Sequence, residues 1–401
     1  IIDINNIKGW ILDRDKIYHK SKKFFKIIGI KISTNFYKYN WDQPIIVQNE
    51  IGILGIIKNI RTNRYLLQAK VEPGNINKIQ IAPTVQATKS NYTQAHGGKK
   101  IPFINFFFKK ENIQSSKQSE QRFRYLNKFN SNILFKTSSK IKINPEFYWF
   151  SKKEIKSLIR LKNLINMDTI SVFSSFIKKL NNDNPINSFK NINLWIKKND
   201  KRFFIKTKIV SLSKLNDWKI NHKHIVNKDN KHFSIIGTQI NANKREVSNW
   251  SQPIIKGKKL AFAGFIKSRF NNTEHYLCRY ILKPGLKSSS LSCTVNTSDI
   301  SKHKKNKNLN LNEINFLKNY FVSKSRKNKV AFDNILSDEG GRFYQCQIRY
   351  MVLNLTDIKD LKVPDKYIWV SHNQMVNLIK NKKIDIEARL LFGSINIDNI
   401  S

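Results

Sequence analysis

Three polar strings hold the residues of this 401-residue sequence that could do chemistry. In the first string, QAKVEPGN, the polar residues Gln68, Lys70 and Glu72 alternate with Ala69 and Val71. On a β-strand this spacing places the three polar side chains on one face, about 7 Å apart. A polar face of this kind within strand-like apolar sequence is a candidate functional site. The alternative interpretation is a strand face exposed to solvent.

The other two strings supply hydrogen-bonding groups and glycines. PTVQATKSNY follows the first string, and SDEGGRFYQCQIRY lies near the end of the chain. Adjacent glycines let a ligand approach the backbone closely, and an arginine guanidinium binds phosphate through two hydrogen bonds. Together with the end of the first string, they provide Asn75, Gln86, Ser90, Asn91, Tyr92, Gly340, Gly341, Arg342, Tyr344 and Arg349 as candidate site residues.

The usual signatures of bound cofactors and metals are absent from the sequence. It contains no GxGxxG, no Walker phosphate loop and no HExxH. The spacing of Cys278, Cys293 and Cys346 fits neither a zinc site nor a disulfide framework, so we expect no metal and a reduced, cytoplasmic compartment. The eight histidines nominate no catalytic triad, and we interpret His19 and His232 as structural or surface residues. No apolar run approaches the roughly 20 residues of a membrane span.

The strong positive charge has two interpretations. The net charge is +45, and a basic protein of this kind often binds nucleic acid. However, Lys, Asn and Ile are abundant from end to end, as AT-rich codons would produce, and the basic residues mark no single region. We therefore favour codon usage as the cause and keep nucleic-acid binding as the alternative.

The chain contains two copies of one unit. WDQPI, which begins at Trp41, recurs as WSQPI at Trp250, and YLLQAKVEPG at Tyr65 recurs as YLCRYILKPG at Tyr276. The landmarks keep their order at a nearly constant offset, which indicates a tandem duplication. We predict a first repeat at 1–180, a linker at 181–199 and a second repeat at 200–401. Trp41 could stack on a base or a sugar, and a core position is the alternative.

The periodicity of each copy predicts the elements that position these strings. IGILGII, YLLQAKVEP and HFSIIGTQI alternate or run apolar like strands. Apolar residues at helical spacing follow between Ile155 and Leu180 and again between Ile384 and Leu391. Each unit is therefore expected to be α+β, with a sheet first and helices at its C-terminal end. Segments 109–118 and 296–319 are predicted surface loops.

Taken together, these strings resemble the NDP-hexose 2,3-dehydratases of deoxysugar biosynthesis. The resemblance rests on WDQPIIVQNEIGILGI, the string from Gln68 to Tyr92, LINMD at 164–168, and LSDEGGRFY with RYMV. It covers nearly the whole chain. It implies a tandem duplication of two Nudix-like mixed sheet-and-helix units without the Nudix metal box, no cofactor and a homodimer.

The resemblance also implies a reaction. Family members remove water across C2 and C3 of an NDP-4-keto-6-deoxyhexose, usually the dTDP-glucose derivative. The C4 ketone acidifies the C3 proton, so a general base can form an enolate before hydroxide leaves C2. An NADPH-dependent 3-ketoreductase then reduces the 3,4-diketo product. The matching positions nominate Lys70, Glu72, Tyr92 and Tyr344 for catalysis, and Trp41, Gln68, Asn75, Gln86, Ser90, Asn91, Gly340, Gly341, Arg342 and Arg349 for substrate binding.

Within these positions we assign three roles as hypotheses. Lys70 or Glu72 transfers a proton, and Tyr92 or Tyr344 donates a hydrogen bond to a substrate oxygen. The two arginines of the third string, Arg342 and Arg349, hold the diphosphate.

The two copies diverge where the family strings lie. The second copy reads RYILKPG, so Arg279, Ile281 and Lys283 stand where the first copy has Gln68, Lys70 and Glu72. The first copy reads SEQRFRYL where the second has SDEGGRFY. One interpretation is a single composite or specialised site, with the other pocket structural. The other is decay to a sugar-nucleotide-binding protein without catalysis. We favour a working enzyme because the first-copy strings are intact over a long stretch.

Overall fold

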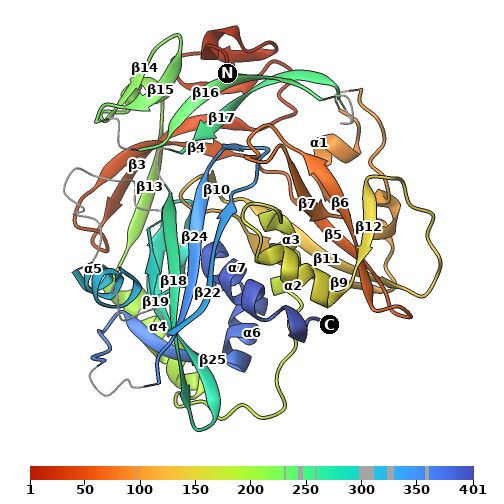
Figure 1. Cartoon of the computed structure of the whole chain (residues 1–401). Helices are drawn as coiled ribbons and strands as arrows, with labels where there is room; N and C mark the ends of the chain where they lie inside the picture. The colour runs from red at the N-terminus through yellow and green to blue at the C-terminus, as the bar shows by residue number, and fades with distance from the viewer. Residues whose placement is uncertain are drawn as a thin grey trace.

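The computed structural model describes residues 1–95, 97–229, 232–242, 247–257, 260–297, 311–322, 329–356 and 361–401, which form a mixed α+β structure (Figure 1). Its strands belong to four sheets, a small one and a larger one in each half of the chain. The two small sheets lie side by side at the top of Figure 1 and share one apolar core, which contains Ile27, Ile46, Ile235 and Ile255.

The small sheets have the same strand order. In each, an antiparallel ladder of four strands ends on a short parallel strand from much later in the chain. The first comprises β1 (Trp10–Leu12), β2 (Lys16–His19), β3 (Lys26–Thr34), β4 (Trp41–Val47) and β10 (Tyr125–Leu126). The second comprises β14 (Trp218–Ile220), β15 (His224–Asn227), β16 (Ser234–Asn241), β17 (Asn249–Lys256) and β23 (Phe343–Tyr344).

The larger sheets also share one strand order. The first runs β12 (Phe147–Phe150), β6 (Arg64–Val71), β5 (Gly52–Asn59), β11 (Phe129–Thr137) and β9 (Ile113–Ser119), with β7 (Ile79–Pro83) on β6 and β8 (Val85–Ala87) on β5. The second runs β25 (Tyr367–Ser371), β19 (Thr273–Lys283), β18 (Ala261–Phe270), β24 (Gln347–Asn354) and β22 (Val330–Ser337), with β20 (Leu286–Ser292) on β19 and β21 (Val295–Asn296) on β18.

The helices that follow each larger sheet pack in the middle of the molecule (Figure 1). They are α2 (Lys152–Ile159) and α3 (Met167–Ser174) in the first half, and α6 (His372–Lys380) and α7 (Ile386–Ile395) in the second. Ser151 and Ser371 start α2 and α6 with the same capping box, in which serine and the third helical residue satisfy each other's backbone N–H groups. Helices α3 and α7 contact each other and belong to one large apolar core, which also includes residues of both larger sheets.

Each half also contributes a segment to the small sheet of the other half. Strand β13 (Ile205–Val210) pairs with β3, and the 3-10 helix η3 (Leu212–Lys214) follows it. In return, the N–H of Ile2 donates to the carbonyl of Gly237 on β16 at 2.9 Å, and the 3-10 helix η1 (Ile4–Asn6) packs beside it. The two halves are therefore held together through backbone pairing as well as through apolar packing.

Several sequence predictions need correction or completion. Segment 109–118 is not wholly a loop, because β9 begins at Ile113 and pairs with β11 as an edge strand. Within 296–319, residues 298–310 lie outside the described part, but α5 (Leu311–Phe316) and the π-helix η4 (Leu317–Val322) are helical. The predicted linker at 181–199 contains most of α4 (Phe189–Arg202), which Ser188 caps.

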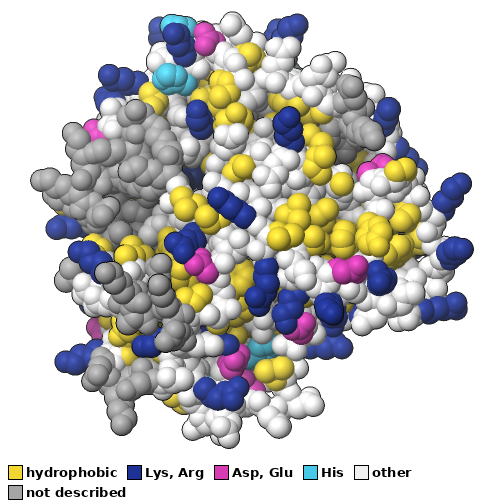
Figure 2. Space-filling view, viewed as in Figure 1, with side chains coloured by type: hydrophobic (Ala, Val, Ile, Leu, Met, Phe, Trp, Pro, Cys, Tyr) yellow, Lys and Arg dark blue, Asp and Glu magenta, His cyan; other side chains and the backbone are white. Residues whose placement is uncertain are grey.

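The remaining short elements are α1 (Lys89–Tyr92), η2 (Ile104–Phe108) and η6 (Ile397–Asn399). In the described part of the chain, no helix is long and apolar enough to cross a membrane. On the face of the molecule that Figure 2 shows, Lys and Arg side chains are scattered with Asp and Glu among them, and they form no single basic patch.

Candidate active site

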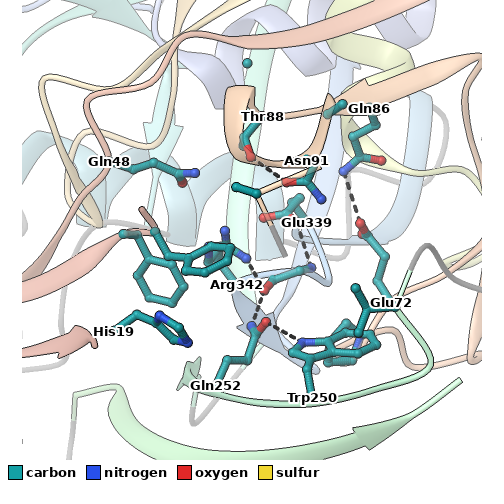
Figure 3. Close-up of a pocket in the computed structure, with 18 of the residues that line it drawn as sticks. His19, Gln48, Glu72, Gln86, Thr88, Asn91, Trp250, Gln252, Glu339 and Arg342 are labelled. Carbon is teal, nitrogen blue, oxygen red and sulfur yellow. Dashed lines mark hydrogen bonds between the residues drawn. The ribbon is translucent and has the colours of Figure 1, made fainter. Parts of the chain in front are cut away.

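A cavity of about 660 Å³ lies between the two halves of the chain, and both halves line it (Figure 3). The first half contributes Lys70, Glu72, Gln86, Asn91, Glu120 and Asp168, among others, and the second contributes Trp250, Gln252, Glu339, Gly341 and Arg342. Six of the predicted site residues are thereby brought together, namely Lys70, Glu72, Gln86, Asn91, Gly341 and Arg342.

A backbone contact between the two polar strings closes one side of this cavity. The N–H of Gly74 donates to the carbonyl of Gly340 at 2.7 Å, and the N–H of Gln345 donates to the carbonyl of Gly74 at 2.9 Å. A Cβ atom on Gly74 would lie 1.8 Å from the carbonyl oxygen of Phe343, so no other residue fits without moving the backbone. The first-copy string QAKVEPGN and the second-copy string DEGGRFY therefore form one site.

Lys70 and Glu72 turn toward the interior at the end of β6. Their exposed fractions are 7% and 5%, so the interpretation as a solvent-exposed strand face is wrong for this pair. Lys70 Nζ lies 3.2 Å from Glu72 Oε1 and donates to the carbonyl of Gln86, while Gln86 Nε2 donates to Glu72 at 3.3 Å. The ion pair and the amide hold the Glu72 carboxylate at the cavity wall.

Three further carboxyl groups line the same cavity. Glu120 and Asp168 are buried and Glu339 is half-buried. Burial, followed by the charges of Glu120, Glu339 and Glu72, raises the pKa of Asp168 well above its usual range. Burial and the Glu72 charge raise the pKa of Glu339 to about 7, and burial raises that of Glu120. The cavity can therefore hold protonated carboxyl groups near neutral pH.

Cationic groups face these acids. Burial lowers the pKa of Lys128 to about 8, although Glu120 opposes this shift, and Lys128 Nζ donates to the carbonyl of Glu50. The Arg342 guanidinium lies 4.2 Å from the centroid of the Phe25 ring and donates to the carbonyl of Gly341 at 2.9 Å. Its remaining donors make Arg342 suitable for an anionic group of a ligand.

Aromatic side chains form another wall of the cavity. Trp10, His19, Phe24 and Phe25 come from the first small sheet and its turns, and Trp250 comes from β17. The interpretation of His19 as a structural or surface residue was incomplete, because this side chain lines the cavity. Burial lowers its pKa. This wall could stack against a planar ring such as a nucleobase.

Four of the predicted residues lie outside the cavity because their side chains serve the fold. Trp41 stacks on Phe123, with ring centroids 6.1 Å apart. Gln68 Nε2 donates to the carbonyl of Pro83, and the Tyr92 ring packs edge-on against Phe108. Lys256 lies over the ring of Tyr344. None of these four lines the cavity.

The other four predicted residues also do not line the cavity: three contact residues close to it, and Arg349 lies elsewhere. Asn75 Nδ2 donates to the carbonyl of Lys70, and Ser90 Oγ donates to Glu50. Gly340 makes the backbone contact with Gly74. Arg349 forms two hydrogen bonds with Asp333 between β24 and β22, so its guanidinium is committed to a carboxylate outside the cavity.

In the second half, the equivalent positions are filled by neutralised side chains. Lys283, which matches Glu72, lies 3.1 Å from Asp385 and 3.0 Å from Glu387, and all three are fully buried. Arg279, which matches Gln68, pairs with buried Glu313. A core ion network replaces the acid-rich cavity there.

Sequence reasoning did not nominate Glu120, Lys128 or Asp168. Glu120 and Lys128 lie in loops before and after β10, and nothing in their local pattern indicates burial. Asp168 ends the LINMD string, which was quoted for the resemblance but was given no role for this residue. Among the described residues, no group of three or more His, Cys, Asp or Glu side chains is arranged to hold a metal ion.

Comparison with known proteins places the chain in a family. Residues 1–176 and 189–395 match the family model of NDP-hexose 2,3-dehydratase. Relatives from Saccharopolyspora spinosa and Streptomyces violaceoruber are named dTDP-4-dehydro-6-deoxy-alpha-D-glucopyranose 2,3-dehydratase. Each is 29% identical to this chain over 98% of its length and over 87% and 91% of the respective relative. A relative of the same name from Amycolatopsis orientalis is 28% identical over 95% of this chain and 82% of its own. The chain therefore belongs to the NDP-hexose 2,3-dehydratase family.

Proposed function

We propose that this enzyme removes water across C2 and C3 of dTDP-4-keto-6-deoxyglucose, which is the substrate class in the names of its relatives. The observation that carries the proposal is the composite cavity, in which the Lys70–Glu72 pair of one half faces Glu339 and Arg342 of the other. The cavity offers bases, acids and an anion-binding arginine together.

Glu72 is the base in this proposal. Its carboxylate is paired with Lys70 and hydrogen-bonded to Gln86, which fixes its position at the cavity wall. Removal of the C3 proton by Glu72 yields an enolate whose charge resides on the C4 oxygen. The C2 hydroxyl then leaves, and the resulting enol tautomerises to the 3,4-diketo-2,6-dideoxy sugar.

Hydrogen-bond donors in the cavity stabilise the enolate oxygen. Lys128 and the Tyr125 hydroxyl fit this role because both line the cavity, and Lys128 carries a proton near neutral pH. Tyr92 and Tyr344, the tyrosines nominated from the sequence, line no part of it. We therefore transfer the predicted tyrosine role to Tyr125.

The nucleotide provides binding energy at a distance from the reacting carbons. In this proposal Arg342 holds the diphosphate, and the aromatic wall that includes Trp10 and Trp250 holds the base. Arg349 has no part in it, since that side chain is paired with Asp333. Binding of the remote groups orients C3 toward Glu72.

We infer that the chain is a tandem duplication of two Nudix-like units. The identical strand orders of the small and larger sheets support the duplication. The reaction as written needs no cofactor, because proton transfers alone balance it. A homodimer and an NADPH-dependent 3-ketoreductase that consumes the product remain predictions from the resemblance. The buried thiols of Cys278 and Cys293 are consistent with the predicted cytoplasmic compartment.

The test is to incubate the full chain with dTDP-4-keto-6-deoxyglucose alone and to measure release of dTDP by mass spectrometry. We expect dTDP and a sugar-derived breakdown product, because the diketo product is unstable. A folded protein that bound dTDP but left the substrate intact would mean a binding protein that has lost catalysis. Absence of any dTDP binding would overturn the proposal and favour the alternative of nucleic-acid binding. Nucleic-acid binding is recognised because it weakens steeply as the salt concentration rises.

A further inference from the structure

We propose that Asp168 is a further catalytic residue, which donates the proton that the C2 hydroxyl needs to leave as water. The inference rests on the proposed function, which assigns the opposite step, removal of the C3 proton, to Glu72. Asp168 lines the same cavity as Glu72 and is 3% exposed.

The geometry places Asp168 beside the base through one shared neighbour. Asn166 caps helix α3 by accepting a hydrogen bond from the N–H of Asp168 at 2.7 Å. The Nδ2 atom of Asn166 lies 3.5 Å from Glu72 Oε2. Among the described residues, no side chain hydrogen-bonds to the Asp168 carboxyl group, so the cavity is left for a ligand to contact it.

In the second half of the chain, the three equivalent positions form a buried ion network. Lys283, Asp385 and Glu387 stand where the first half has Glu72, Asn166 and Asp168. Asp385 likewise caps its helix, α7, and Lys283 neutralises both carboxylates at 3.1 and 3.0 Å. In the first half Glu72 pairs with Lys70, whereas Asp168 forms no ion pair among the described residues. A buried acid without a neutralising partner costs stability, and such groups persist at functional sites.

The charges around Asp168 favour its protonated form. Burial raises its pKa most, and the charges of Glu120, Glu339 and Glu72, which line the same cavity, add to this shift. Lys70 opposes them, and so does the buried Arg389 of helix α7. Tyr125, whose buried hydroxyl interacts electrostatically with Asp168, is a further titratable group that faces it. The net effect raises the pKa of Asp168 well above its usual range, which favours the protonated form that a general acid requires.

The two carboxyl groups balance the reaction. Glu72 takes the C3 proton, and the C3–H electron pair passes to the C4 oxygen as the enolate. Those electrons return to form the C2–C3 double bond as the C2–O bond breaks, and Asp168 transfers its proton to the departing oxygen. Water leaves, Asp168 is a carboxylate and Glu72 is protonated. Transfer of that proton from Glu72 to Asp168 restores the starting state, and no oxidant or reductant is consumed.

The test separates the two steps with Asp168→Asn and Glu72→Gln in deuterium oxide. Exchange of the C3 proton of dTDP-4-keto-6-deoxyglucose, followed by NMR, reports the base, and loss of water, followed by mass spectrometry, reports the acid. We expect Asp168→Asn to dehydrate about 100- to 10,000-fold more slowly while C3 exchange continues. We expect Glu72→Gln to lose both. Glu387→Gln is the matched control for the carboxyl-to-amide change, and its dehydration rate is expected to match that of the wild type.

Each outcome decides something. Dehydration by Asp168→Asn at the wild-type rate, or loss of C3 exchange together with dehydration, would overturn the role of Asp168. A wild-type enzyme that neither exchanges nor dehydrates would instead overturn the proposed function. If Asp168→Asn does not fold, the pH dependence of the two rates in the wild-type enzyme provides the test. The ratio of dehydration to C3 exchange is expected to fall as pH rises and Asp168 loses its proton, and a constant ratio would contradict the proposal.

Discussion

The backbone N–H of Gly74 lies 2.7 Å from the carbonyl oxygen of Gly340, and this hydrogen bond joins the two halves beside the cavity. It fixes the strand end that carries Glu72 against the loop that carries Arg342. In the proposed mechanism neither half has a complete set of groups, because the proposed base, Glu72, and the proposed diphosphate-binding residue, Arg342, come from different copies. Their relative position depends on this contact.

Substitution of Gly74 by alanine is expected to damage both stability and catalysis. The added Cβ would meet the backbone of Phe343 at 1.8 Å, so the loop must move. We expect the free energy of unfolding to fall by more than about 1 kcal/mol, measured by urea denaturation. Gly257→Ala is the control, since the nearest atom to its Cβ would be the side-chain sulfur of Cys346, and the nearest backbone atom would lie at an ordinary contact distance of 3.8 Å. Equal dehydration rates in the wild type and Gly74→Ala would contradict the composite site.

The two predicted arginines are expected to differ in nucleotide binding. Loss of a charged hydrogen-bond donor to the diphosphate in Arg342→Ala is expected to weaken dTDP binding by about 1.5–3 kcal/mol, measured by calorimetry. Arg349→Ala removes an ion pair with Asp333 outside the cavity, so its dTDP affinity is expected to equal that of the wild type. Similar losses in both variants would refute this placement of the diphosphate.

Substitutions at equivalent positions in the two halves are expected to affect different properties, namely catalysis in the first half and stability in the second. Glu72→Gln keeps the shape of the side chain but removes the anion that pairs with Lys70, and each folded molecule is expected to dehydrate at least about 100-fold more slowly. Lys283→Met leaves Asp385 and Glu387 buried without their cation, which is expected to cost about 3–5 kcal/mol of unfolding free energy. Urea denaturation and the dehydration rate per folded molecule distinguish these effects. A stable Lys283→Met variant with no activity would reverse the assignment.

The carboxyl cluster predicts a pH dependence of stability. The pKa of Glu339 is about 7, which is above its usual value of 4.5, so the folded state holds this proton more tightly than the unfolded state. The stabilisation from Glu339 is fully present below pH 4.5 and is lost as pH rises through about 7. We expect Glu339→Gln to reduce the fall in unfolding free energy across this range. Part of the fall is expected to remain in this variant, because burial also raises the pKa of Asp338 to about 7. An unchanged pH profile would contradict this cause.

The α+β class and several elements of the fold were predictable because their signals are local. The offset between WDQPI and WSQPI indicated two units, and β4 and β17 occupy the same place in two sheets of the same order. The alternation around Lys70 predicted β6. Segment 109–118 was misassigned because β9 is an edge strand, mostly exposed, whose Ser- and Gln-rich sequence lacks an apolar face.

The site was only partly predictable because its residues meet through tertiary contacts. Glu72 and Arg342 were nominated from separate strings, but only the folded chain shows that these strings touch. Arg342 and Arg349 lie in the same string, yet one lines the cavity and the other pairs with Asp333. Asp168 was quoted within a string but received no role, since its distinctive property is burial among other carboxyl groups.

The most direct test of the central claim is dehydration coupled to a 3-ketoreductase and NADPH, measured in the wild type and in Glu72→Gln. Mass spectrometry follows the conversion of dTDP-4-keto-6-deoxyglucose to its 2-deoxy-4-keto product. The composite cavity predicts that the wild type forms this product and that Glu72→Gln, although folded and able to bind dTDP, does not. Product formation at equal rates in both proteins, or intact substrate with both, would contradict it.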